Sequence, residues 1–150
     1  MEEHEYKSTY SEIANIRCEF EKALTNNKAK CVYSRHFYLA DREGYACKSS
    51  ELSAKCRELL EKLRDNSRFI LKMQQVSNKL PHNMEMRVQV GGLSGIQTLL
   101  TQGQQGDQIE DIFALIEQAV TVYGGLEKLP YNRIVQSIRS YQGRTGRKRS

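Results

Sequence analysis

Cysteine and histidine are the residue types of this chain best suited to binding a metal ion or acting as nucleophiles. The 150-residue sequence contains four cysteines and three histidines, which are Cys18, Cys31, Cys47, Cys56, His4, His36 and His82. One reading is a zinc site, whose ligands would be Cys31, His36, Cys47 and Cys56. No Cys-x-x-Cys or His-x-x-x-His pair supplies two neighbouring ligands, however. We therefore expect reduced cysteines that pack as small apolar residues, with no metal and no cofactor.

Glycine-rich segments support two further chemistries, phosphate binding and the display of a nucleophilic serine. Gly-Lys-Ser/Thr and Gly-x-Gly-x-x-Gly are both absent from the segment 91–106. Gly92-Leu93-Ser94-Gly95 also misses the spacing of a Gly-x-Ser-x-Gly elbow. We interpret these glycines as hinges, assign no catalytic residue and expect no enzymatic activity.

The densest charge lies in the last eight residues, which carry four basic residues and no acidic one: Arg144, Arg147, Lys148 and Arg149. The whole chain has a formal charge of +5, which leaves only +1 for residues 1–142. A flexible basic segment attracts nucleic-acid phosphates and also fits a nuclear import signal. We therefore expect a nuclear or nucleocytoplasmic location.

A heptad-like apolar series from Leu52 to Leu80 is the strongest structural pattern. Apolar residues return at alternating steps of four and three until Pro81, and Ser49-Ser50 supply a cap in front of them. The spacing predicts one helix of about 30 residues that must pack on another long helix. Residues 8–26 and 28–43 are read as helical too, although 31–33 and 37–39 also suit strands. Together they would form the antiparallel partner of this long helix.

After Pro81 the pattern changes. Alternation from Met84 to Val90 predicts a half-buried strand or an extended linker. Residues 107–142 read as two helices, the first opened by a capping box at Asp107 and ended by Gly124. The stretch 122–126 resembles a short sequence of ARID-type DNA-binding domains. The chain lacks the Trp usual in that family, and we carry no function over from this resemblance.

We therefore predict an all-α fold. It consists of a long antiparallel helical hairpin or coiled coil, a small helical unit and a disordered basic C-terminal tail. The segments are 1–80 for the hairpin, 81–106 for a Gly-containing linker that includes the short strand, 107–142 for the helical pair and 143–150 for the tail.

The function expected from this fold is protein–protein interaction, as an assembly subunit of a nuclear multi-protein complex that works through helical-bundle packing. The partners would be other subunits or further copies of the chain, with no membrane contact because the apolar runs are short. The expected interface comprises Leu59, Leu63, Asn66, Phe69, Ile70, Met73, Val76, Leu80, Ile112, Phe113, Ile116 and Val120. Within it, Asn66 either specifies the register as a buried amide or marks a bend that is partly exposed. The alternative function is a small helical nucleic-acid-binding protein that uses its basic tail.

Overall fold

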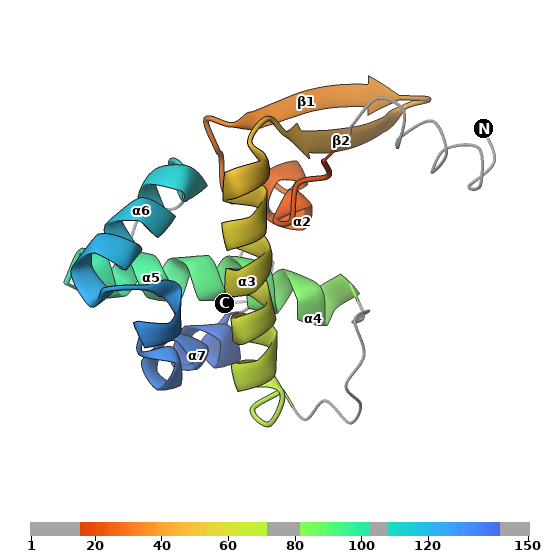
Figure 1. The fold of residues 1–150 in the computed structure, drawn as a ribbon. Helices are drawn as coiled ribbons and strands as arrows, with labels where there is room; N and C mark the ends of the chain where they lie inside the picture. The colour runs from red at the N-terminus through yellow and green to blue at the C-terminus, as the bar shows by residue number, and fades with distance from the viewer. Residues whose placement is uncertain (1–15, 72–81, 103–107, 142–150) are drawn as a thin grey trace.

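The computed structural model describes residues 16–71, 82–102 and 108–141. Its elements follow in the order α2 (Glu21–Thr25), β1 (Ser34–Leu39), β2 (Arg42–Cys47), α3 (Ser50–Ser67), α4 (His82–Met86), η1 (Arg87–Gly91), α5 (Gly92–Leu100), α6 (Ile112–Tyr123), η2 (Leu126–Lys128) and α7 (Tyr131–Ser140). In Figure 1 the two strands lie across one end of α3, and the helical segment from α4 to α5 crosses α3. Among the described residues, no helix has the length and apolar character needed to cross a membrane.

The predicted all-α hairpin is wrong, because the segment expected to pair with α3 contains a two-stranded antiparallel sheet. β1 pairs with β2 from Ser34 opposite Cys47 to Leu39 opposite Arg42. Ala40 and Asp41 connect the strands, and both have positive φ, at 52° and 69°. A two-residue turn of this kind matches the twist of the flanking strands. Of the two segments that also suited strands, 37–39 lies in β1, whereas 31–33 precedes it and is not a strand.

Helix α3 starts where the sequence predicts and ends earlier. Ser49 caps it, with its side chain accepting a hydrogen bond from the backbone N–H of Leu52. The helix ends at Ser67, whereas the heptad pattern predicts a helix reaching Leu80. Asn66 and Ser67 each donate a side-chain hydrogen bond to the backbone carbonyl four residues earlier, and such bonds compete with regular helix geometry. Residues 72–81 lie outside the described part of the chain.

The segment predicted as a strand or linker is helical. α4, η1 and α5 run without a break from His82 to Leu100, and η1 is a π-helical turn. Val88, Val90, Leu93 and Ile96 are buried in the core. Their burial on several sides of the helix explains the misleading alternation, since a fully buried helix need not show a 3.6-residue period.

Three glycines in this helix allow close packing and are not hinges. A Cβ atom on Gly91 would lie 2.7 Å from the Cα of Ile138, and one on Gly95 would lie 3.0 Å from the carbonyl oxygen of Ile134. Both positions therefore let the backbone of α7 approach α5 and η1. A Cβ on Gly92 would lie 2.6 Å from the Cδ1 of Leu63. The absence of side chains here creates the surface onto which α3 and α7 pack.

The segment 107–142 contains α6 and α7, which pack on α5 and not mainly on each other as the predicted helical pair would. Asp111, rather than the predicted Asp107, caps α6: its side chain accepts hydrogen bonds from the N–H groups of Phe113 and Val32. Gly124 ends α6 with a left-handed φ of 94°, as predicted. Asp107 lies outside the described residues. One apolar core joins side chains from α2, α3, η1, α5, α6 and α7, so α3 buries its stripe within its own chain.

Candidate functional site

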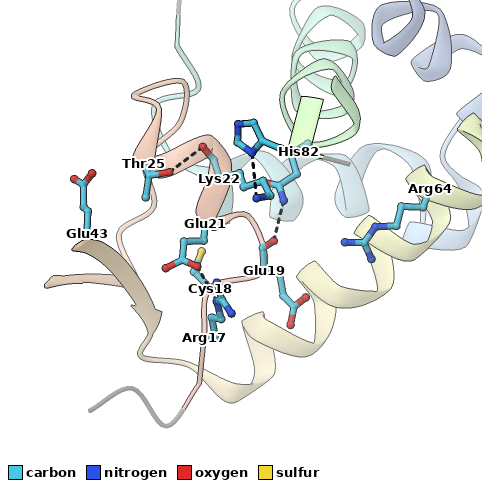
Figure 2. A pocket seen from close by; sticks show the side chains of 10 residues that line it. Arg17, Cys18, Glu19, Glu21, Lys22, Thr25, Glu43, Arg64 and His82 are labelled. Carbon is cyan, nitrogen blue, oxygen red and sulfur yellow. Dashed lines mark hydrogen bonds and ion pairs between the residues drawn. The ribbon is translucent and has the colours of Figure 1, made fainter. Parts of the chain in front are cut away.

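A polar pocket of about 410 Å³ opens between α2, β2, α3 and α4. Its walls comprise Arg17, Cys18, Glu19, Glu21, Lys22, Thr25, Glu43, Arg64, His82 and Gln89. Figure 2 shows these side chains arriving from the segment before α2, from α2 itself, from β2, from α3 and from α4. Such a mixture of charges, in a hollow large enough for a small molecule, makes this the first place to look for chemistry.

Several charges in the pocket wall are already paired. The guanidinium Nε of Arg17 lies 2.7 Å from a carboxylate oxygen of Glu21, whose other oxygen accepts the backbone N–H of Tyr45. The ammonium of Lys22 donates to Nδ1 of His82 at 3.2 Å. These pairs hold α2 against β2 and α4, so they have a structural role that accounts for the residue types.

A buried network adjoins the pocket through Arg64, Gln89 and Glu19, which line it. Arg64 donates two hydrogen bonds to the buried carboxylate of Glu85, at 3.2 and 2.8 Å. The amide of Gln89 accepts the backbone N–H of Ala23 and donates to Glu85 and to the carbonyl oxygen of Glu19. Each buried polar group is thus satisfied by a partner from another element. Within the described residues, these polar side chains of the pocket wall therefore connect α2, α3, α4 and η1.

A second cavity is small, apolar and lined by all four cysteines. It measures about 10 Å³, and Cys18, Cys31, Cys47 and Cys56 reach it from four separate segments. Burial raises the pKa of the Cys18 thiol to about 12, although a hydrogen bond from the backbone of Phe20 partly opposes this. Burial also raises the pKa values of Cys31 and Cys56. All four are free thiols, as predicted, and a raised pKa makes a thiol a poor nucleophile.

His36, the imidazole of the conceivable zinc set, lies away from this cavity. It belongs to the hairpin, where its Nε2 lies 2.8 Å from a carboxylate oxygen of Glu43 and its ring stacks on Tyr45. In the structure, Cys18 and not His36 lines the cavity together with Cys31, Cys47 and Cys56. The convergence of Cys18 with the other three depends on the hairpin and leaves no signal in the sequence spacing.

The residues predicted to form a protein interface divide by burial. Leu59, Leu63, Ile112 and Ile116 are fully buried, Ile70, Phe113 and Val120 are half-buried, and Asn66 and Phe69 are exposed. Met73, Val76 and Leu80 lie outside the described residues, as do Arg144, Arg147, Lys148 and Arg149. The buried members form the chain's own core. Asn66 follows the second of its two readings, since its exposed amide donates to the carbonyl of Lys62.

The exposed face of α7 is a feature that the sequence reading missed. Asn132, Arg133, Gln136, Arg139 and Ser140 are exposed, while Ile134, Val135 and Ile138 face the core. The helix contains no acidic residue. The guanidinium of Arg87 donates to the carbonyl oxygen of Arg139 at 2.6 Å and brings a further positive charge to its C-terminal end. The available signal was the lack of Asp and Glu from residue 128 to the end of the chain.

Comparison of the chain with protein-family models, with curated proteins and with solved structures gives no significant match. The interpretation of these sites therefore depends on their geometry alone.

Proposed function

We propose that this chain is a non-enzymatic binding protein that contacts nucleic acid through α7 and the basic segment that follows it. The observation that carries the proposal is the exposed face of α7, where two arginines alternate with amides and no carboxylate is present. Arginine contacts phosphates and guanine edges, and asparagine and glutamine pair with adenine edges. Of the functions considered from the sequence, nucleic-acid binding uses this face most directly.

The arginines of this face are available for a ligand. In the described part of the chain, neither Arg133 nor Arg139 has an ion-pair partner. Glu58 and Glu127 lie near Tyr131 at the start of α7, where they raise the pKa of its hydroxyl after the larger effect of burial. The basic side chains of α7 are therefore least balanced by nearby carboxylates at its C-terminal end.

Further basic residues follow α7 in the sequence. Arg144, Arg147, Lys148 and Arg149 follow α7 within nine residues of its last residue, Ser140. Together with Arg133 and Arg139 they provide six cations. If all six neutralised phosphates of a duplex, the logarithm of the binding constant would fall with a slope of about −5 against the logarithm of salt concentration. This corresponds to a loss of about 10³-fold in affinity between 50 and 200 mM salt.

Fluorescence anisotropy of the full chain with a labelled DNA duplex and a labelled RNA strand tests the proposal. We expect Arg133→Gln combined with Arg139→Gln to weaken binding and to lower the salt slope by about 2. Deleting residues 144–150 should lower it by about 4. These changes avoid the buried side of α7, so circular dichroism should show an unchanged fold.

A matched control removes the same charge from another surface. Arg57 on α3 and Arg68, the residue after its end, are partly exposed and form ion pairs with Glu19 and Asp65. Arg57→Gln with Arg68→Gln therefore lowers the net charge equally. We expect this variant to bind almost as tightly as the original chain. Equal weakening by both double variants would show that only net charge matters, and undetectable binding at 50 mM salt would reject the proposal.

A second candidate function, association with other proteins, is favoured by Phe69. Its side chain is 91% exposed just after the end of α3, which is unusual for a large aromatic residue. If Phe69 anchors a partner or a second copy, Phe69→Ser should lower the mass measured by light scattering or abolish co-purification, without a loss of stability. Leu63→Glu is unsuited to this test, because Leu63 is fully buried in the chain's own core.

A further inference from the structure

The four cysteines of the chain converge although they are distant in sequence. Cys18 precedes α2, Cys31 precedes β1, Cys47 ends β2 and Cys56 lies on α3. All four line the same apolar cavity, and the sequence contains no other cysteine. Burial alone explains one or two such residues, since free cysteine packs as a small apolar side chain. It does not explain why every thiol of the chain lines the same cavity.

Backbone groups beside two of the thiols lower their pKa values, against the larger effect of burial. The sulfur of Cys18 accepts a hydrogen bond from the backbone of Phe20, two residues later, and that of Cys31 accepts one from Tyr33 at the same spacing. The backbone of Phe113 at the start of α6, whose N–H donates to Asp111, also lowers the pKa of Cys31. A neutral thiol gains little from such donors, whereas a thiolate bound to a metal ion gains considerably.

We infer that Cys18, Cys31, Cys47 and Cys56 form a four-thiolate site for one Zn²⁺ ion. Tetrahedral zinc with four cysteine ligands is a common structural site, with Zn–S bonds of about 2.3 Å. On binding, four S–H bonds break, four Zn–S bonds form and four protons pass to the solvent, with no change in oxidation state. The ion would join the hairpin to α3 and to the segment before α2.

The sulfur atoms must move to bind the ion. Among the described residues, no group of three or more His, Cys, Asp or Glu side chains is already arranged to hold a metal ion. The sulfur of Cys47 donates to the carbonyl oxygen of Ser49 at 3.2 Å, a bond that ligation would replace. Rotation between staggered side-chain conformers moves a cysteine sulfur by about 3 Å. The site therefore requires these side chains to rotate towards a common centre.

The polar pocket provides a route for the ion. Cys18 and Glu19 line both the polar pocket and the thiol cavity, so the two hollows adjoin at this point. Figure 2 shows Cys18 beside Glu21 at the wall of the polar pocket. Glu19 and Glu21 lie at this entrance, where they are ion-paired with Arg57 and Arg17.

Titration of the reduced full chain with Co²⁺, followed by displacement with Zn²⁺, tests the site. Four thiolates around Co²⁺ give sulfur-to-cobalt charge transfer in the near ultraviolet and strong visible bands of a tetrahedral ion. We expect these bands to saturate at one Co²⁺ per chain, and native mass spectrometry to find one Zn²⁺ in the protein purified without chelator. Each Cys→Ser variant should weaken metal binding by at least about 100-fold.

The control is His36→Ala, which removes the histidine of β1 without touching the cavity, and its cobalt spectrum should be unchanged. Because a Cys→Ser variant can also lose its fold, the measurement on the original chain decides the question. A reduced, folded chain without tetrahedral cobalt bands overturns the inference, as does a protein purified with two disulfides and no metal. A spectrum altered by His36→Ala would overturn the four-cysteine ligand set.

Discussion

Replacing Gly91 with alanine should separate α7 from η1, because the added methyl group has no room. Its Cβ would lie 2.7 Å from the Cα of Ile138 and 3.1 Å from the carbonyl oxygen of Ser137. Both are backbone atoms, so a rotamer change cannot relieve the overlap. Overpacking costs about 1–3 kcal/mol, and a contact with backbone belongs at the upper end. Alanine recovers at most about 1 kcal/mol of helix propensity, leaving a net loss of about 2 kcal/mol.

Urea and thermal unfolding followed by circular dichroism measure this loss. For a chain of this length, a loss of about 2 kcal/mol lowers the melting temperature by roughly 4–8 °C. Ser94→Ala in α5 is the matched control, because it also ends in alanine within the same helix, and it should change stability by less than about 0.5 kcal/mol. An unchanged or raised stability of Gly91→Ala would refute the close packing of η1 on α7.

A double-mutant cycle adds a test of the mechanism. Gly92→Ala overlaps the side chain of Leu63 at 2.6 Å, so adding Leu63→Ala removes the overlapping atoms. We expect a favourable coupling of at least about 1 kcal/mol between these two changes. Gly91→Ala and Ile138→Ala should show little favourable coupling, because the overlap there involves backbone. Equal coupling in the two cycles would mean that a general loosening of the core, and not these contacts, causes the effects.

Three further substitutions probe individual contacts through the free energy of unfolding. Tyr131 is buried and donates to the carbonyl oxygen of Leu126 at 2.6 Å. Burial raises the pKa of its hydroxyl in the folded state. Its contribution to the free energy of unfolding is therefore complete below the unfolded pKa of about 10 and is lost as pH rises above it. Tyr131→Phe should cost about 1 kcal/mol at neutral pH and reduce the loss of stability at alkaline pH. Glu85→Ala removes the buried partner of Arg64 and should cost about 3 kcal/mol. Asp65→Ala, which breaks an exposed ion pair, should cost less than about 1 kcal/mol. Equal losses of stability would contradict the role of burial. Asp111→Ala removes the cap of α6 and should cost about 1–2 kcal/mol, an expectation that fails if Asp111→Asn, which keeps a capping oxygen, costs as much.

Those parts of the fold that depend on local signals were predictable. Ser49 caps α3 and Gly124 ends α6 because a hydroxyl oxygen and a left-handed φ are local requirements. The hairpin was missed because its turn uses Ala40 and Asp41 at positive φ, where asparagine and glycine are the usual signal. The pairing of β1 with β2 holds that turn in place.

The prediction for residues 82–100 was wrong for the opposite reason. Its sequence carries a signal, the alternation from Met84 to Val90, that predicts the wrong structure. The next residues include Gly91, Gly92 and Gly95, which were interpreted as hinges. In the structure α3 and α7 pack closely against them. A glycine reveals whether it serves flexibility or close contact only when its neighbours in space are known.

The cysteines show the same limit in the chemistry of the candidate site. Zinc sites are recognised in sequences by pairs of ligands two to four residues apart, because one turn of backbone then presents both to the ion. Here each cysteine lies on a different segment, and the hairpin, α3 and the segment before α2 must all fold before the thiols meet. If the proposed zinc site exists, ion binding and folding are coupled in this chain, because the unfolded chain presents no two neighbouring ligands. Metal removal should then loosen the hairpin and the segment before α2 first, and leave the helices α5, α6 and α7, which contribute no cysteine, more protected from hydrogen exchange.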